Sequence, residues 1–98
     1  MKNMDGFEWD KGNIDKNLVK HKVSVKECEE VFFNKPFISF KDIIHSGSEK
    51  RFIVLGSADS GKILHIVYTL RKKMVRIISA RPVNKKERRL YESTKNKK

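Results

Sequence analysis

Three apolar segments separated by short polar turns constrain the fold of this chain more than any other feature. Residues 51–57, 63–70 and 74–81 read RFIVLGS, ILHIVYTL and MVRIISAR, and each has the length and composition of one β-strand. Residues 59–61 (DSG) have the composition of a tight turn, and residues 71–73 (RKK) join the second segment to the third. Because connections this short join neighbouring antiparallel strands, the sequence predicts an antiparallel meander.

Helices are predicted on both sides of these strands. The first helix spans about residues 11–20, with Asp10 as its N-cap. Ser24 and Glu27 have the spacing of a capping box that opens a second helix, and Pro36 ends it.

The remaining elements are a short strand and a basic helix. The strand covers residues 37–40, and Pro82 stops the last strand because proline cannot donate to a ladder. Asn84 and Glu87 form a second capping box at the start of the C-terminal helix. Residues 93–98 are expected to be a frayed basic tail.

Together these elements predict one domain over residues 1–98 with an α+β fold. Its parts are two N-terminal helices, an antiparallel meander of about four strands and a C-terminal basic helix. The helices are expected to pack on one face of the sheet, which leaves the other face free to hold a ligand.

The positive charge is concentrated in the last third of the chain. Residues 71–98 carry twelve Lys and Arg against two acids, a net +10, whereas residues 1–70 carry eleven bases and ten acids, a net +1, which together give +11. A cationic surface of this density favours an anionic polymer as partner, RNA or DNA before a membrane. A membrane partner is the weaker alternative, because no segment is apolar enough to span a bilayer and the last helix has few apolar residues to insert.

Cysteine and histidine usage excludes several kinds of site. The single Cys28 forms no internal disulfide, which together with the lack of an export leader suggests a cytoplasmic protein. His21, His45 and His65 lie far apart in the sequence, and no carboxylate cluster has the spacing of a metal site. We therefore expect no metal and no cofactor.

A nuclease without a metal would use the 2′-hydroxyl of its RNA substrate as the nucleophile, so the protein must supply proton transfer and positive charge. Guanidinium groups suit the charged phosphorane, because their planar forks match phosphate oxygens. Arg76 and Arg81 lie on opposite faces of a regular strand, and only a bulge or a bend before Pro82 would bring both to one site. Either arginine could instead be a solvated edge residue or an ion-pair partner.

Glu49, Arg51 and His65 are further candidates. Glu49 and Arg51 share one strand face, so they could serve a site or simply pair with each other. His65 could carry a proton near neutral pH, although a histidine inside an apolar strand is more often a core residue.

Four bases lie close together on the last helix: Lys85, Lys86, Arg88 and Arg89. Residues three and four apart are neighbours on a helix surface, so these side chains form one cluster. So few acids accompany them that contact with an RNA backbone is a better explanation than a solvated helix, although both remain open.

Blocks spread along the chain also carry a family resemblance. FEWD at 7–10, NLVKHKVS at 17–24 and EKRFIVLG at 49–56 are followed by an apolar strand that runs into a basic helix over residues 75–92. This pattern resembles the BrnT toxins, a branch of the RelE-like bacterial ribonuclease toxins. At one position, Lys22, the family usually carries glycine.

The resemblance implies a RelE-like fold and a metal-independent endoribonuclease that cleaves RNA and stops translation and growth. It implies that Arg51, Arg76 and Arg81 hold the scissile phosphate and that Glu49 is the base or orients it. The implied partner is a cognate antitoxin of BrnA-like, ribbon-helix-helix type, which covers the site and through which the complex binds operator DNA. The alternative is a non-catalytic nucleic-acid-binding module that uses the basic C-terminal strand and helix.

Overall fold

The computed structural model describes residues 6–9, 22–35, 37–42, 47 and 49–96. The helix predicted at 11–20, with its cap, lies outside these residues, as do His21 and His45. The elements in chain order are β1 (Gly6–Glu8), α2 (Val25–Phe33), β2 (Ile38–Lys41), β3 (Arg51–Ser57), β4 (Ile63–Arg71), β5 (Met74–Pro82) and α3 (Lys85–Asn96).

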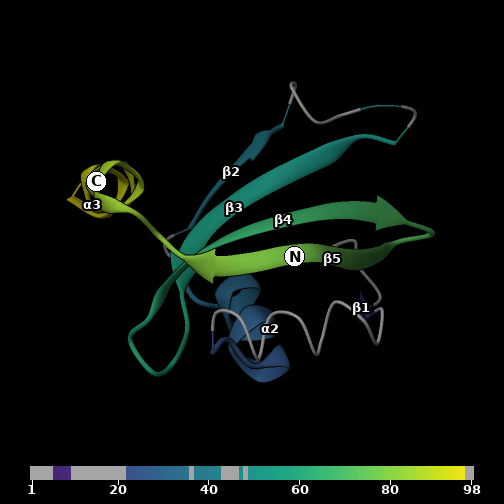
Figure 1. Ribbon diagram of the computed structural model, residues 1–98, viewed down its shortest axis with the longest axis horizontal. Helices are drawn as coiled ribbons and strands as arrows, with labels where there is room; N and C mark the ends of the chain where they lie inside the picture. The colour runs from purple at the N-terminus through teal and green to yellow at the C-terminus, as the bar shows by residue number, and fades with distance from the viewer. Residues whose placement is uncertain (1–5, 10–21, 36, 43–46, 48, 97–98) are drawn as a thin grey trace.

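The strands form one mixed sheet in the order β1-β5-β4-β3-β2 (Figure 1). The predicted antiparallel meander is present, because β2, β3, β4 and β5 pair as successive antiparallel neighbours. The sheet has a fifth strand at its other edge that was not predicted, because β1 pairs parallel with β5 and makes the sheet mixed. Sequence patterning missed β1 because it is short and its partner is far along the chain, so no turn signal connects the two strands.

The hydrophobic core lies between α2 and one face of the sheet (Figure 1). The helix begins at the predicted Ser24–Glu27 capping box, and Cys28, Val31 and Phe32 form its buried side. Gly56 of β3 leaves room for α2, because a Cβ there would lie 2.8 Å from a methyl group of Val31. The core residues of the strands are Val54, Leu64, Ile66, Tyr68, Val75, Ile77 and Ala80.

Polar contacts fasten the start of α2 to the turn between β3 and β4. Ser60 donates a hydrogen bond to the Glu27 carboxylate at 2.8 Å, and the Lys62 ammonium lies 3.1 Å from the same oxygen. Lys62 also donates to the backbone carbonyl of Lys22 at 2.9 Å. Lys22 has a φ of +55°, the left-handed conformation that glycine adopts without strain.

The strands β4 and β5 change register once along their length. Val67 pairs with Ser79, but the next residue, Tyr68, pairs with Ile77. Ile78 is therefore the extra residue of a β-bulge. This bulge changes which side chains of β5 share a face, with consequences for the arginines described below.

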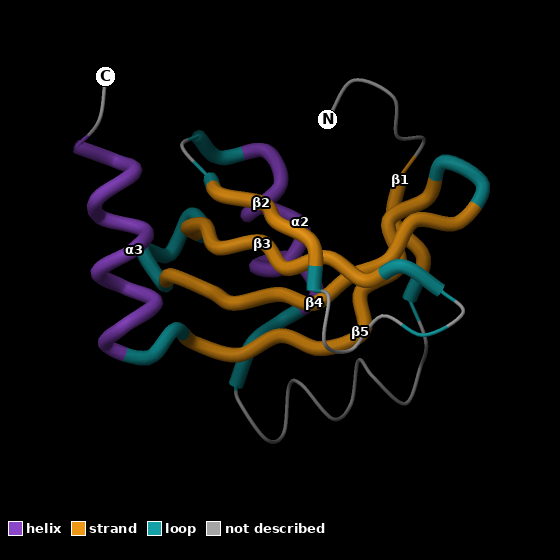
Figure 2. Tube along the Cα trace, turned by 90° about the horizontal axis from the view of Figure 1, so that it is seen from above, coloured by secondary structure: helices purple, strands orange, loops and turns teal. Residues whose placement is uncertain are grey.

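The helix α3 lies across the end of the strands, away from α2 (Figure 2). It begins at the predicted capping box, in which the Glu87 amide donates to the Asn84 side chain at 2.8 Å and the Asn84 amide donates to the Glu87 carboxylate at 3.0 Å. Tyr91 anchors it, with only 3% of its surface exposed. The helix continues to Asn96, past residue 93, where the frayed tail was predicted to begin.

Candidate active site

The bulge at Ile78 places Arg76 and Arg81 on the same face of the sheet. Arg81 pairs with His65 of β4, and Arg76 pairs with Thr69 of the same strand. Since His65 and Thr69 are four residues apart in one strand, their side chains and those of both partners point to one side. The sequence could not decide this point, because it depended on whether the strand was regular.

This side of the sheet faces away from the core and from α2, because the core residues of β4 alternate with His65 and Thr69. We call it the arginine face and define it by six side chains from four strands. They are Glu8 of β1, Arg51 of β3, His65 and Thr69 of β4, and Arg76 and Arg81 of β5.

One group of charged residues lies at the end of this face, beside the start of α3. Arg81 donates from both terminal nitrogens to the two carboxylate oxygens of Glu87, each at 2.8 Å. The His65 Nε2 atom lies 3.6 Å from the Oε2 atom of Glu87. We call these three residues the Arg81 cluster. It joins two strands to a helix N-terminus, where backbone N–H groups favour an anion.

The surroundings of the cluster set its protonation. Burial lowers the pKa of His65 below 6.5, with a further decrease from the Arg81 charge that Glu87 and Asp42 oppose. The hydrogen bonds from Arg81 lower the pKa of Glu87 to about 2, and the same contact raises the pKa of Arg81. At neutral pH the cluster therefore holds a neutral imidazole next to a guanidinium, which pairs a proton acceptor with a binding group for an anion.

A second group of polar residues crosses the arginine face in a single row. Arg51 pairs with Thr69, Thr69 with Arg76, and Arg76 with Glu8, so the row runs from β3 to β1. Arg76 makes an ion pair with Glu8 at 3.1 Å, and the buried Thr69 hydroxyl donates to the Lys50 carbonyl at 2.7 Å. This row is about 13 Å from the Arg81 cluster, the rise of four strand residues. Arg51, Arg76 and Arg81 therefore share one face but lie at two separate places on it.

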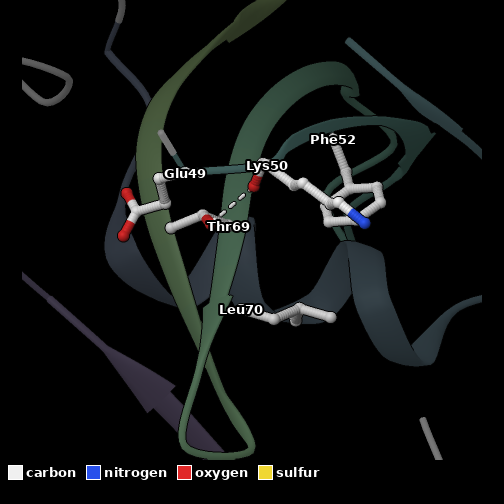
Figure 3. Close-up of a pocket in the computed structure, with 5 residues that line it drawn as sticks. All are labelled: Glu49, Lys50, Phe52, Thr69 and Leu70. Atoms are coloured by element: carbon white, nitrogen blue, oxygen red, sulfur yellow. Dashed lines mark hydrogen bonds between the residues drawn. The ribbon is translucent and has the colours of Figure 1, made fainter. Parts of the chain in front are cut away.

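Glu49 lies beyond this row and pairs with Arg71 rather than with Arg51. The Arg71 guanidinium donates to one Glu49 oxygen at 2.9 and 3.0 Å, in an exposed ion pair. Glu49 also lines an open pocket of about 390 Å³ with Lys50, Phe52, Thr69 and Leu70. Its carboxylate points away from Phe52 and Leu70 (Figure 3). Glu49 is therefore remote from the proton acceptor in the Arg81 cluster.

The four predicted RNA-contacting bases surround the start of α3 and are exposed: Lys85, Lys86, Arg88 and Arg89. Lys85 and Lys86 lie in the first turn of α3, where positive side chains oppose the helix dipole at a cost of roughly 0.3–1 kcal/mol each. A bound polyanion would offset that cost, whereas a purely structural role gives no reason for it.

The sequence pattern missed Glu87 as a site residue, because its capping-box spacing already explained it. One signal pointed to it: Glu87 is an acid within a strongly basic segment, six residues after Arg81. Thr69 and Glu8 were also missed, since only strand pairing places them beside Arg76.

Within the described residues, no group of three or more His, Cys, Asp or Glu side chains is arranged to hold a metal ion. The same part of the chain contains no helix with the length and hydropathy of a membrane span.

Comparisons with known proteins agree with this fold. The family model for the ribonuclease toxin BrnT of type II toxin–antitoxin systems matches residues 9–87. No curated protein sequence matches the chain. Among solved structures, the ribonuclease toxin BrnT of Brucella abortus superposes with a TM-score of 0.61 at 16% identity, covering 82% of this chain and 97% of the other. At that identity the superposition shows a shared fold.

Proposed function

This chain belongs to the BrnT family of ribonuclease toxins of type II toxin–antitoxin systems, and we propose that it is an endoribonuclease that cleaves RNA without a metal ion and thereby inhibits translation. The observation that carries this proposal is the bulge at Ile78, which gives Arg76 and Arg81 a common face with Arg51 and His65. That face lies opposite α2, so its cations face away from the core.

In the proposed reaction the Arg81 cluster acts on the scissile phosphate. His65, neutral near pH 7, takes the proton of the RNA 2′-hydroxyl as its oxygen attacks phosphorus. Arg81 stabilises the negative charge that grows on the phosphorane oxygens. The bond from phosphorus to the 5′-oxygen then breaks, that oxygen takes a proton from water, and His65 returns its proton to solvent, which leaves a 2′,3′-cyclic phosphate and a 5′-hydroxyl.

The other bases hold the substrate on either side of the cleaved bond. Arg51 and Arg76 lie about 13 Å along the strands from the Arg81 cluster, so they are placed for a different phosphate of the same RNA strand. Lys85, Lys86, Arg88 and Arg89 contact flanking phosphates from α3. Glu49 forms an ion pair with Arg71 and lies far from the Arg81 cluster, so proton transfer is assigned to His65 rather than to Glu49.

The proposed partner is a cognate antitoxin of the BrnA-like, ribbon-helix-helix type, with an acidic or amphipathic segment that covers the arginine face. The resemblance to the family supports this assignment, as does the net charge of +11. A surface of this charge would associate quickly with an acidic partner, in a manner sensitive to salt. We further propose that the complex works in the cytoplasm and binds its operator DNA through the antitoxin.

Induced expression in a bacterium, followed by primer extension on total RNA, tests this proposal. We expect growth arrest with discrete new 5′ ends, both relieved by co-expression of the neighbouring gene. Arg81→Ala and Arg51→Ala should each reduce the arrest, and if both leave it intact the site assignment is wrong. Intact RNA in cells that hold the soluble, folded chain would instead indicate a nucleic-acid-binding module without chemistry.

A further inference from the structure

Glu87 contacts every other member of the Arg81 cluster, and the mechanism above gives it no task. Its Oε1 atom accepts hydrogen bonds from Arg81 Nη1 at 2.8 Å and from the Asn84 amide at 3.0 Å. Its Oε2 atom accepts a hydrogen bond from Arg81 Nη2 at 2.8 Å and lies 3.6 Å from His65 Nε2. The carboxylate therefore connects the helix cap, the guanidinium and the imidazole.

A carboxylate and a phosphate offer oxygen pairs to the same guanidinium fork. In this structure Glu87 occupies the fork of Arg81, so an RNA phosphate must compete with it for that position. We propose that Glu87 is a positioning residue, which holds Arg81 in the free protein, yields it to the substrate phosphate and then remains beside His65 to stabilise the imidazolium. This inference rests on the proposed function, in which Arg81 binds the scissile phosphate.

The geometry makes the exchange feasible. The Arg81 side chain is 38% exposed and can reach a ligand, whereas Glu87 is 20% exposed and is fixed by the start of α3. After Arg81 leaves, Oε1 still accepts the Asn84 amide and Oε2 still faces His65. One ion pair, Arg81 with Glu87, is thus replaced by two: Arg81 with phosphate and protonated His65 with Glu87.

The balance of charge around His65 supports this role. Arg81 from β5 disfavours protonation of the ring, whereas Glu87 from α3 and Asp42, next to β2, favour it. While Arg81 is paired with Glu87, the ring is neutral and ready to accept a proton. When phosphate draws Arg81 away, Glu87 is left without that cation and favours the protonated ring that the first step produces.

The first test measures binding of a 2′-O-methyl oligoribonucleotide, which lacks the nucleophile and is not cleaved. Glu87→Gln keeps the capping box, because Gln at this position still accepts the Asn84 amide, but removes the charge that competes for Arg81. We expect it to bind the probe about three- to fivefold more tightly, since the partly exposed pair that it loses is worth up to about 1 kcal/mol. It should also cleave RNA more slowly, with the acid limb of the pH–rate profile moved to lower pH.

Glu27→Gln is the matched control, because it changes the corresponding glutamate of the other capping box, outside the arginine face. We expect wild-type probe binding and a wild-type pH–rate profile from it. Binding by folded Glu87→Gln that is equal to or weaker than that of the wild type would overturn the inference.

A second measurement on the wild-type chain decides the question even if Glu87→Gln does not fold. Carbon-13 NMR of the Glu87 carboxyl should show its pKa rising from about 2 when the probe saturates the protein, because the hydrogen bonds from Arg81 are lost. An unchanged pKa with the probe bound would overturn the inference.

Arg81→Ala separates this inference from the proposed function. If it binds the probe as tightly as the wild type, the phosphate contact at Arg81 is wrong and the inference fails with it. If Arg81→Ala weakens binding but Glu87→Gln does not strengthen it, the role of Glu87 alone is wrong.

Discussion

The two capping boxes of this chain share a local geometry and differ in their neighbours. In each, a glutamate accepts the N-cap amide and has a pKa of about 2. For Glu27 the largest cause is the backbone of Ser24, within its own box, whereas for Glu87 it is the side chain of Arg81, from a strand. The same motif therefore fastens a helix to a turn at one place and forms part of a candidate active site at the other.

The largest effect that separates the two regions should come from Arg81→Ala. It removes the guanidinium that faces the phosphorane, so we expect RNA cleavage to fall about 10²–10³-fold. The matched change beside the other box, Lys62→Ala, removes the cation that pairs with Glu27 and should change cleavage less than about twofold. Initial rates on a fluorescent RNA at equal folded fraction measure both, and similar losses in the two variants would contradict the comparison.

The pH dependence of cleavage should arise from the region around Glu87 and not from the region around Glu27. Burial lowers the pKa of His65 below 6.5, so the neutral base predominates at neutral pH and is lost as the pH falls through that lower pKa. The rate constant is therefore expected to decline on the acid side of 6.5. A pH–rate profile of the wild type and of His65→Gln provides the measurement, and an identical acid limb in the two proteins would exclude His65 as the base.

In the region around Glu27 and α2, changes in packing should alter the free energy of unfolding. Gly56→Ala places a methyl group 2.8 Å from a Val31 methyl and 3.2 Å from Phe37, which forces α2 away from the sheet. We expect a loss of about 1–3 kcal/mol in the free energy of unfolding, as for an overpacked core. Urea titration measures it, with Gly47→Ala as the control, because a Cβ at Gly47 meets nothing within 4 Å. A loss of equal size in both variants would rule out the close approach of α2 as the cause.

The glutamates of both capping boxes should contribute by similar amounts to the loss of stability at low pH. Each glutamate has a folded pKa near 2 against an ordinary value of 4.5, so its stabilisation is complete above 4.5 and is lost as the pH falls toward 2. The wild type should lose unfolding free energy as the pH falls from 4.5 toward 2. In Glu27→Gln and in Glu87→Gln this loss should be smaller by about 1–2 kcal/mol. Urea titrations at several pH values check this, and a loss that persists in the double variant would place the acid sensitivity elsewhere.

The smallest effect is expected at Lys22, which lies two residues before the N-cap of α2 and has a φ of +55°. Lys22→Gly relieves the left-handed backbone but adds freedom to the unfolded chain, so we expect stabilisation of at most about 1 kcal/mol. Thermal unfolding at neutral pH measures it, with Lys26→Gly within α2 as a control that should destabilise. A destabilised Lys22→Gly would show that the lysine side chain contributes more than the backbone strain costs.

Local patterns predicted much of this fold. The strand at 51–57 was predicted with the residue bounds that the structure has, and both capping boxes were identified from their spacing. These features depend on neighbours within a few residues along the chain, which a sequence displays directly. The parallel strand β1 was missed, because its partner β5 is nearly the whole chain away.

The candidate site was predicted only in part, for the same reason. The arginines, His65 and the basic helix were identified by residue type, and the family resemblance assigned them to a phosphate. Their arrangement depends on the bulge at Ile78, and nothing in the run VRIISAR marks where an extra residue enters the ladder. The assignment of Glu49 also changed, because its ion pair with Arg71 forms only when β3 lies beside β4.

Sequence patterns were enough to predict the α+β class, the meander, the caps of α2 and α3 and the concentration of positive charge at the C-terminal end. Each of these follows from residue type and short spacing. The folded structure was needed to show which cations share a face and which glutamate joins them. Face and pairing are set by strand register, and a single inserted residue reverses the side on which every later side chain of β5 lies.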